Sequence, residues 1–495
     1  MILNFFSMFL VLPALSSNIH IFGIYTSCIA FTTFLSYSDF GFLPAAQKLA
    51  MKFALKSDMK GEAEVIGFAL FILLISSLFL SVGIVFLLID PNLYLSDVTN
   101  NSDVCIARSL FAVLLISVLN FVLQKLIQMI LATRYLDYKF QILNVFINSL
   151  RIIGIFYFFH AERYDIVGYF LYTQLVSLVL LLLFLAYVLG STGMTSTLLL
   201  TSIKFNKTIY LSTKNLALSG VVSTLIWIFL YELDVIYISK NYGMTWVAFY
   251  AIGFTILAFF RGIFGMIYSP FVTRFNELIY LKNWTQIKNF YQMIVSFFSP
   301  FAIYPILLFF LNSEFFVISW VGLDYLQSVD LFRILVLVNI FAFLSYPTGM
   351  LIFSFGLLKR TLLFNVSTVI LYWALVYVLF DFIGFEILAF SKLLIFCILF
   401  FYNLRFYNKF CKTRPTYLIQ NVLKHHTIPA TVIVALSSVF NSIFVPEQSK
   451  TNLLIFVLFF ILSFVMSLIL HYLLNRSFRL NVKQLVNVFN YEKTY

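Results

Sequence analysis

Charge is the scarcest property of this sequence. Only 11% of its 495 residues are charged, whereas 62% are apolar and the mean hydropathy is +0.99. A soluble globular protein carries about 25% charged and about 45–50% apolar residues, so this composition excludes that class. The apolar runs are continuous over roughly 20 residues, which is typical of membrane-spanning helices and not of the alternating strands of a membrane β-barrel. The sequence therefore predicts an all-α polytopic membrane protein.

Cysteine and histidine are also few and dispersed. The four cysteines form no CxxC pair, and among the five histidines only His425 and His426 are adjacent. Such spacing supports neither a disulfide framework nor a metal site. We therefore expect no metal and no bound cofactor.

Long extramembrane segments are missing as well. The longest connection on one side, Asn312 to Asp330, is short, and the connections on the other side contain no recognisable domain. Membrane polysaccharide polymerases and glycosyltransferases need an ordered aqueous loop to carry their site. The absence of such a loop argues against a membrane enzyme of this kind.

What the sequence does contain is a series of about fourteen apolar runs, each read as a membrane-spanning helix. The first run is short and has Pro13 near its end. The runs cover residues 2–15, 19–43, 65–89, 104–132, 140–159, 166–189, 216–238, 246–270, 290–311, 331–355, 362–380, 385–404, 427–445 and 453–474.

The basic residues concentrate in every second connection and in the C-terminal tail. The alternate set of connections holds three, Arg163, Lys240 and Lys450, and it also holds most of the loop acids. Because cytoplasmic loops are enriched in Lys and Arg, this segregation predicts that both termini are cytoplasmic. The net charge of +12 then reflects membrane topology and contact with membrane lipids, and no nucleic-acid partner is expected.

Two connectors in the two halves of the chain look alike. Ser36 to Glu64 and Gly265 to Lys288 each lead from the end of an apolar run into a basic amphipathic stretch. Six spans separate them, which predicts two parallel six-helix lobes around a central cavity, followed by two C-terminal helices. The predicted segments are an N-terminal lobe at 1–189, a cytoplasmic connector at 190–214, a C-terminal lobe at 215–404, a basic cytoplasmic loop at 405–426, two helices within 427–474 and a cytoplasmic tail at 475–495.

The stretch from Tyr231 to Tyr250 places acids inside an apolar run. Glu232 and Asp234 precede a predicted turn at 241–243, so the stretch has the pattern of a helical hairpin. A carboxylate in hydrocarbon costs at least ~2.5 kcal/mol and is normally turned toward a bundle interior or an aqueous cavity. We expect Glu232 to be wetted.

Three segments resemble a known family. Asp39 to Gly41, then LDVIYISKNYGMTWVAFYAIGF at Leu233 to Phe254, then SPFVTRFNEL at Ser269 to Leu278 are similar to recurrent features of MOP-superfamily polysaccharide transporters, in particular O-antigen flippases of the Wzx type. The resemblance implies that two rocking lobes move an undecaprenyl-pyrophosphate-linked oligosaccharide between the leaflets of a bacterial inner membrane, for polysaccharide or lipopolysaccharide biosynthesis. It also implies a polysaccharide polymerase and a chain-length regulator as partners. An H⁺ or Na⁺ gradient could drive the movement.

Charged residues within the apolar runs are the candidate site residues. Lys125, Arg261 and Lys392 lie mid-span, where a cation is costly unless it faces water or an anion. They are interpreted as a cationic cavity for a lipid pyrophosphate, the alternative being snorkelling or ion pairs with neighbouring helices. Asp234 is a candidate gating or ion-coupling carboxylate or a fixed structural partner. Asp39 is a second such candidate, at a helix end where Gly41 allows close helix approach.

Two further arginines, Arg151 and Arg333, stand close to predicted helix ends. We expect them to anchor their helices at the membrane interface.

The competing function on the same fold is a drug or cation antiporter of the MATE type. Such a transporter is expected to carry acids deep in its N-terminal lobe. The first two spans offer only Asp39, at an end, and the mid-span charges are mainly basic. The sequence therefore favours an anionic substrate.

Overall fold

The computed structural model describes residues 2–36, 38–39, 41–160, 164–268, 271–355, 358–411 and 417–482. Within these ranges every regular element is a helix, which confirms the predicted all-α membrane fold. Phe40, Ser269 and Pro270, which belong to the resemblance, lie outside the described residues, as do Arg163 and the tail from residue 483.

The chain divides into two compact units, Met1–Ala248 and Phe249–Tyr495. The division falls within the predicted C-terminal lobe, and the lobe boundaries drawn from the sequence stay a prediction. The helices of the first unit are α1 (Ile2–Leu15), α2 (Ile19–Ser36), α3 (Phe42–Ala54), α4 (Met59–Ile89), α5 (Asn101–Ala132), α6 (Asp137–Phe158), α7 (Ile166–Thr192), α8 (Ser196–Thr201), α9 (Lys207–Trp227) and α10 (Leu233–Asn241), with a 3-10 turn at Pro91–Leu93 and a π-helical turn at Ile228–Glu232.

The second unit continues with helices of similar length. Helix α11 begins at Met244, directly after Gly243 turns the chain with a φ of 91° at the predicted position, and most of it belongs to the second unit. The helices are α11 (Met244–Tyr268), α12 (Phe271–Tyr280), α13 (Trp284–Leu311), α14 (Ser313–Val321), α15 (Ser328–Ser354), α16 (Leu358–Ile383), α17 (Ile387–Cys411), α18 (Tyr417–Ile443) and α19 (Lys450–Leu474), with 3-10 turns at Leu323–Tyr325 and Gly384–Glu386.

The span count agrees with the sequence analysis. In the described part of the chain, 11 stretches are long and apolar enough to cross a membrane, and one of them, Thr361–Phe410, includes most of both α16 and α17. The shorter apolar helices α1 and α2 complete the fourteen predicted spans.

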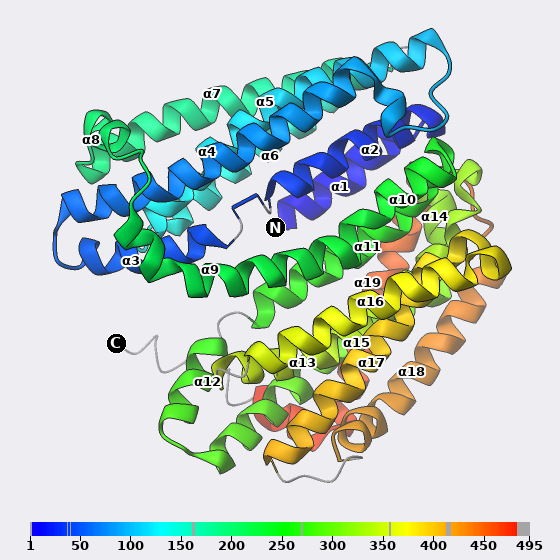
Figure 1. The fold of residues 1–495 in the computed structure, drawn as a ribbon. Coiled ribbons are helices and arrows are strands. Elements are labelled where there is room, and N and C mark those ends of the chain that lie inside the picture. The colour runs from blue at the N-terminus through cyan, green and yellow to red at the C-terminus, as the bar shows by residue number, and fades with distance from the viewer. Residues whose placement is uncertain are drawn as a thin grey trace. The chain divides into compact units, whose positions relative to one another are not determined.

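Helix α5 is the centre of the first unit. It packs between α4 and α7 and also contacts α2 and α6 (Figure 1). Its residues Leu110, Phe111 and Leu114 on one side, and Ile127 and Ile130 further along, are fully buried. A membrane helix surrounded on so many sides can present polar side chains to its neighbours or to an internal cavity without exposing them to lipid.

The second predicted span is wrong at its end. The apolar run continues to residue 43, but α2 ends at Ser36 and α3 begins at Phe42. Gly41 has a left-handed φ of 70°, and its N–H donates to Asp39 Oδ1 over 3.1 Å. A Cβ on Gly41 would lie 2.7 Å from Cα of Gly220 in α9, which confirms that Gly41 permits a close helix approach.

Gly41→Ala is expected to destabilise the protein strongly. The left-handed backbone costs about 1–2 kcal/mol for a non-glycine residue, and overpacking against Gly220 adds about 1–3 kcal/mol. The measurement is the thermal unfolding midpoint of the detergent-purified protein. Gly83→Ala is the matched control, because a Cβ added to Gly83 in α4 would meet nothing within 4 Å, so this change should be neutral or stabilising. Equal midpoints for the two variants would contradict this packing.

The two similar connectors have the same local geometry. Amphipathic α3 ends before Ser57, which has a φ of 55°, and Asp58 then caps α4 by accepting from Gly61 N at 2.9 Å. Amphipathic α12 ends before Lys282, with a φ of 53°, and Asn283 then caps α13 by accepting from the N–H of residue 286 at 3.1 Å. In both cases a left-handed residue stops one helix and an Asx cap starts a long one.

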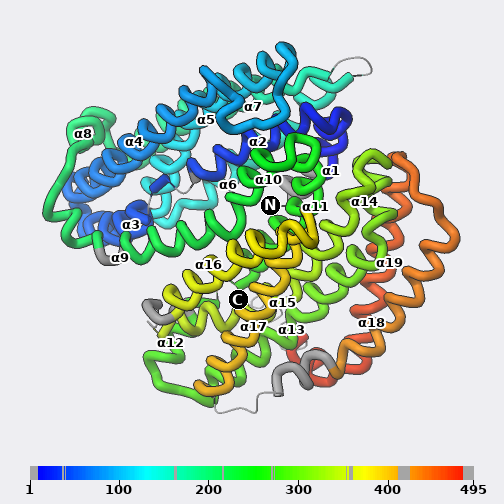
Figure 2. The backbone as a smooth tube through the Cα atoms, turned by 45° about the vertical axis from the view of Figure 1, so that its right-hand side comes forward, coloured from blue at the N-terminus to red at the C-terminus, as the bar shows by residue number. Residues whose placement is uncertain are grey.

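The C-terminal helices α18 and α19 lie side by side and pack on α13 (Figure 2). A chain of buried hydrogen bonds joins the three. Asn475 Oδ1 accepts from the Phe478 N–H over 3.1 Å, so the amide nitrogen of Asn475 is the group that faces His471 Nε2, at 3.2 Å. His471 Nδ1 therefore carries the proton and donates to the Tyr304 hydroxyl at 2.8 Å.

The same logic fixes the second imidazole. The Tyr304 hydroxyl donates to His426 Nδ1 at 3.0 Å, and His426 Nε2 donates to Ser299 Oγ at 2.8 Å. Ser299 ends the chain by donating to the Ser296 carbonyl at 3.1 Å. The Tyr304 hydroxyl thus both donates and accepts between the two imidazoles.

Tyr304→Phe is expected to weaken the packing of α18 and α19 on α13. The change keeps the ring and leaves two buried imidazole nitrogens without a partner, at a cost of about 1–3 kcal/mol for each unsatisfied group. The unfolding midpoint of the purified protein should fall, whereas Tyr377→Phe, on a side chain that is 83% exposed, should not change it. An unchanged midpoint for Tyr304→Phe would show that the hydrogen-bond chain does not stabilise the fold.

Candidate functional site

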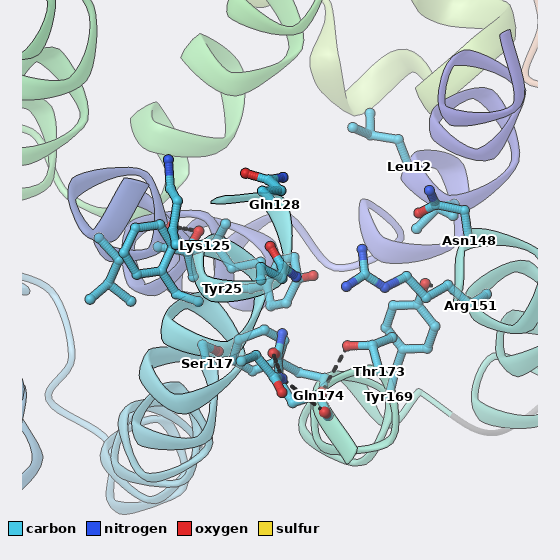
Figure 3. A pocket seen from close by; sticks show the side chains of 18 residues that line it. Leu12, Tyr25, Ser117, Lys125, Gln128, Asn148, Arg151, Tyr169, Thr173 and Gln174 are labelled. Carbon is cyan, nitrogen blue, oxygen red and sulfur yellow. Dashed lines mark hydrogen bonds between the residues drawn. The ribbon is translucent and has the colours of Figure 1, made fainter. Parts of the chain in front are cut away.

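The first unit contains a cavity of about 580 Å³. This volume lies within the ordinary range of small-molecule sites. Five helices, α1, α2, α5, α6 and α7, supply its lining (Figure 3). The lining residues are Val11, Leu12, Tyr25, Ile29, Thr32, Leu35, Ser117, Asn120, Phe121, Gln124, Lys125, Gln128, Asn148, Arg151, Tyr169, Phe170, Thr173 and Gln174.

The chemistry of this lining is one-sided. The described residues that line the cavity include two cations, Lys125 and Arg151, but no Asp or Glu. Five carboxamides and several hydroxyl groups accompany the cations, and aromatic rings complete the wall. Such a surface suits a ligand that is anionic at one point and rich in hydrogen-bonding groups elsewhere.

Arg151 extends into the cavity from α6 (Figure 3). Its Nη2 donates to Ser177 Oγ over 3.1 Å, and its buried Nε has no hydrogen-bond partner. No carboxylate of a described residue forms an ion pair with it. A half-buried guanidinium without a counterion is costly, and a bound anion would supply the missing charge.

The predicted role of Arg151 as an interface anchor is therefore wrong. Helix α6 begins at Asp137 and ends at Phe158, so Arg151 lies within it and not at its end. The sequence did carry a signal, because Asn144, Asn148 and Arg151 follow a spacing of four and three residues and so share one helical face.

Lys125 and Asp39, two of the predicted site residues, are brought together by the structure. Lys125 Nζ lies 3.8 Å from Asp39 Oδ2, and the two side chains are 24% and 12% exposed. The ammonium group also lies 5.3 Å from the centroid of the Phe121 ring. Lys125 lines the cavity. Asp39 lies at the break between α2 and α3, and its carboxylate partly neutralises the charge of Lys125.

The other predicted site residues do not line this cavity. Arg261 lies half-buried in α11 of the second unit, where its carbonyl accepts from the Tyr346 hydroxyl at 3.4 Å. Lys392 in α17 is fully buried, with its Nζ 3.4 Å from the Tyr372 hydroxyl and 4.9 Å from the centre of that ring. Their assignment to a substrate site stays a prediction.

The acids of the hairpin are both buried. Asp234 lies in the first turn of α10 and is 0% exposed, and its proposed gating role stays a prediction. Glu232, which the sequence predicted to be wetted, is only 5% exposed, so that prediction is wrong. It lies in the π-helical turn between α9 and α10, which the hydropathy pattern does not reveal.

Comparison with solved structures identifies similar folds. A multidrug resistance MATE family transporter of the MOP superfamily, in an inward-facing conformation, aligns with a TM-score of 0.62 at 15% identity over 82% of this chain and 96% of its own. The lipid II flippase MurJ, in an inward closed conformation, aligns with a TM-score of 0.61 at 14% identity over 95% of this chain and 98% of its own.

A MOP superfamily transporter from Pyrococcus furiosus, described as having a binding pocket of reverse polarity that suggests a different function, aligns with a TM-score of 0.52 at 16% identity over 83% of this chain and 93% of its own. No family model matches the chain, and neither does the sequence of any curated protein. The chain is a multi-pass membrane protein with the fold that these MOP-superfamily transporters share.

Proposed function

We propose that this protein is a transporter that moves a lipid-linked oligosaccharide across the membrane, with its pyrophosphate bound in the cavity of the first unit. The observation that carries the proposal is Arg151, a half-buried cation that has no carboxylate partner among the described residues and faces a cavity whose described lining lacks acids. The substrate we infer is an undecaprenyl-pyrophosphate-linked repeat unit of an O-antigen or a similar polysaccharide, moved by alternating access. A flippase of a lipid-linked substrate is one of the proteins with this fold.

The proposal includes an orientation. Both termini are placed in the cytoplasm of a bacterial cell, with the protein in the inner membrane, because the Lys and Arg residues concentrate in the connections of that side. A polysaccharide polymerase and a chain-length regulator would act on the exported units. Asp39, beside Lys125, is the candidate for coupling transport to an H⁺ or Na⁺ gradient.

The MATE-type antiporter is the main alternative on the same fold. The charged groups of this lining, Lys125 and Arg151, are both cations, and they would repel a cationic drug. The lining therefore favours an anionic over a cationic substrate.

Deletion of the gene from a polysaccharide-producing host tests the proposal. Undecaprenyl-linked repeat units should accumulate on the cytoplasmic face, and surface polysaccharide should be lost. Complementation with the wild-type gene should restore both. Normal surface polysaccharide in the deletion strain, with no accumulated intermediate, would overturn the proposed function.

A further inference from the structure

A stripe of uncharged polar side chains runs along the cavity face of α5. Ser117, Asn120, Gln124 and Gln128 all line the cavity. Their spacing of three, four and four residues places them on one face of the helix, over about 16 Å at 1.5 Å per residue. We call these four residues the α5 polar stripe.

The first part of the stripe has hydrogen-bonding capacity that the protein does not use. Ser117 and Asn120 are only 6% and 3% exposed. Their side-chain oxygens, Ser117 Oγ and Asn120 Oδ1, are buried and have no hydrogen-bond partner. Buried polar atoms in proteins are nearly always paired, so a ligand bound in this cavity would be favoured if it formed hydrogen bonds with these two atoms.

The orientation of Asn120 is fixed by its neighbour. Its Nδ2 donates to the carbonyl O and to Oε1 of Gln174, both at 2.9 Å. Both amide hydrogens are thereby used, and Oδ1 remains as an acceptor, while the amide nitrogen of Gln174 remains as a donor beside it. Figure 3 shows Ser117 and Gln174 in the same part of the cavity wall.

Ser117 differs from the other small hydroxyls nearby. Serine and threonine in helices usually donate back to a carbonyl of the preceding turn. Thr173 does so to Phe170 at 2.8 Å, and Ser177 does so to Thr173 at 2.7 Å. Ser117 Oγ makes no such bond and can both donate to and accept from a ligand.

We propose that the α5 polar stripe, with Gln174, is the subsite for the uncharged sugar part of the substrate. Sugar hydroxyls donate and accept at the same atom, which matches carboxamide and serine side chains that offer both functions. The rings of Tyr25, Phe121 and Tyr169 in the same lining offer apolar surface for the faces of sugar rings. The inference rests on the proposed function, with Arg151 as the site of the phosphate.

The test measures binding to the purified full-length protein with two probes. One is farnesyl pyrophosphate, and the other is a panel of farnesyl-pyrophosphoryl trisaccharides built from neutral sugars. At least one trisaccharide probe should bind more tightly than the bare pyrophosphate. Asn120→Leu should weaken that probe by about tenfold, the loss of roughly one hydrogen-bonded group, and leave farnesyl pyrophosphate unchanged.

Two other variants keep the result interpretable. Gln128→Leu tests the stripe at its other end without disturbing the contact between Asn120 and Gln174, and Gln141→Leu, on an exposed glutamine of α6, is the matched control. The inference is overturned if the sugars add no affinity, or if the stripe variants weaken both probes equally. Failure of the proposed function has a different signature, namely that Arg151→Gln leaves the binding of both probes unchanged.

Discussion

Arg151→Gln is expected to abolish most of the transport activity. The guanidinium is the cavity cation without a carboxylate partner among the described residues, so its removal takes away the charge that a substrate anion would meet. A hydrogen bond to a charged group contributes about 1.5–3 kcal/mol, which corresponds to roughly a ten- to hundredfold loss of affinity. The measurement is the dissociation constant of a lipid pyrophosphate and the rate of its export. The affinity and export rate of Arg151→Lys should lie between those of the wild type and Arg151→Gln, because Lys keeps the charge and loses the bidentate geometry.

Arg108→Gln is the matched control for this variant. Arg108 is also in the first unit, but it is exposed and donates to the carbonyl of Ile89 at 3.0 Å. Its replacement should leave affinity and export close to wild type. If Arg151→Gln folds, as judged by a monodisperse purified protein, and binds the pyrophosphate as tightly as wild type, the anion site is not at Arg151.

Asp39→Asn should change the affinity for an anion in the opposite direction to Arg151→Gln, so that the anion binds more tightly. Asp39 competes with a substrate anion for Lys125, because its Oδ2 lies 3.8 Å from Lys125 Nζ. Asn keeps a side-chain oxygen for the Gly41 N–H, which Asp39 holds at 3.1 Å, so the break between α2 and α3 should persist. Affinity for a lipid pyrophosphate should rise by roughly tenfold, while export slows because release becomes slower.

The Lys125→Gln and Asp39→Asn/Lys125→Gln variants separate competition from a structural role. Lys125→Gln should weaken anion binding by about tenfold. If the ion pair only tied two helices together, the neutral double variant would restore wild-type binding. We expect no such rescue, because the double variant still lacks the Lys125 cation. A weaker affinity in Asp39→Asn alone would contradict the competition between Asp39 and the substrate.

Much of the fold could be predicted from apolar run lengths. The break after Ser36 was missed, because Phe42 and Leu43 extend the apolar run beyond Asp39 and beyond Gly41, which has a left-handed φ of 70°. Gly41 also packs closely against Gly220, which is far away in the sequence. A hydropathy window averages over such a break.

Part of the candidate site could be predicted from the sequence, because charged residues stand out against an apolar run. Lys125 and Asp39 stand out as charges in or beside apolar runs, but the sequence did not show that they form a pair. The stripe residues Ser117 and Asn120 could not be singled out, because a few polar residues hardly change the mean hydropathy of a helix of 32 residues. Arg151 was misplaced although the predicted span 140–159 ends within one residue of α6, because hydropathy does not show which face of a helix meets a cavity.

The most direct test of the central claim follows a fluorescent lipid-pyrophosphoryl oligosaccharide between the leaflets of vesicles that contain the purified protein. The probe is placed in one leaflet, and a membrane-impermeant quencher reports how fast it leaves. Wild-type protein should move the probe, Arg151→Gln should move it at a rate near that of empty vesicles, and Arg108→Gln should match wild type. Equal movement by wild type and Arg151→Gln, or no movement by wild type, would contradict a transporter that holds its anionic substrate at Arg151.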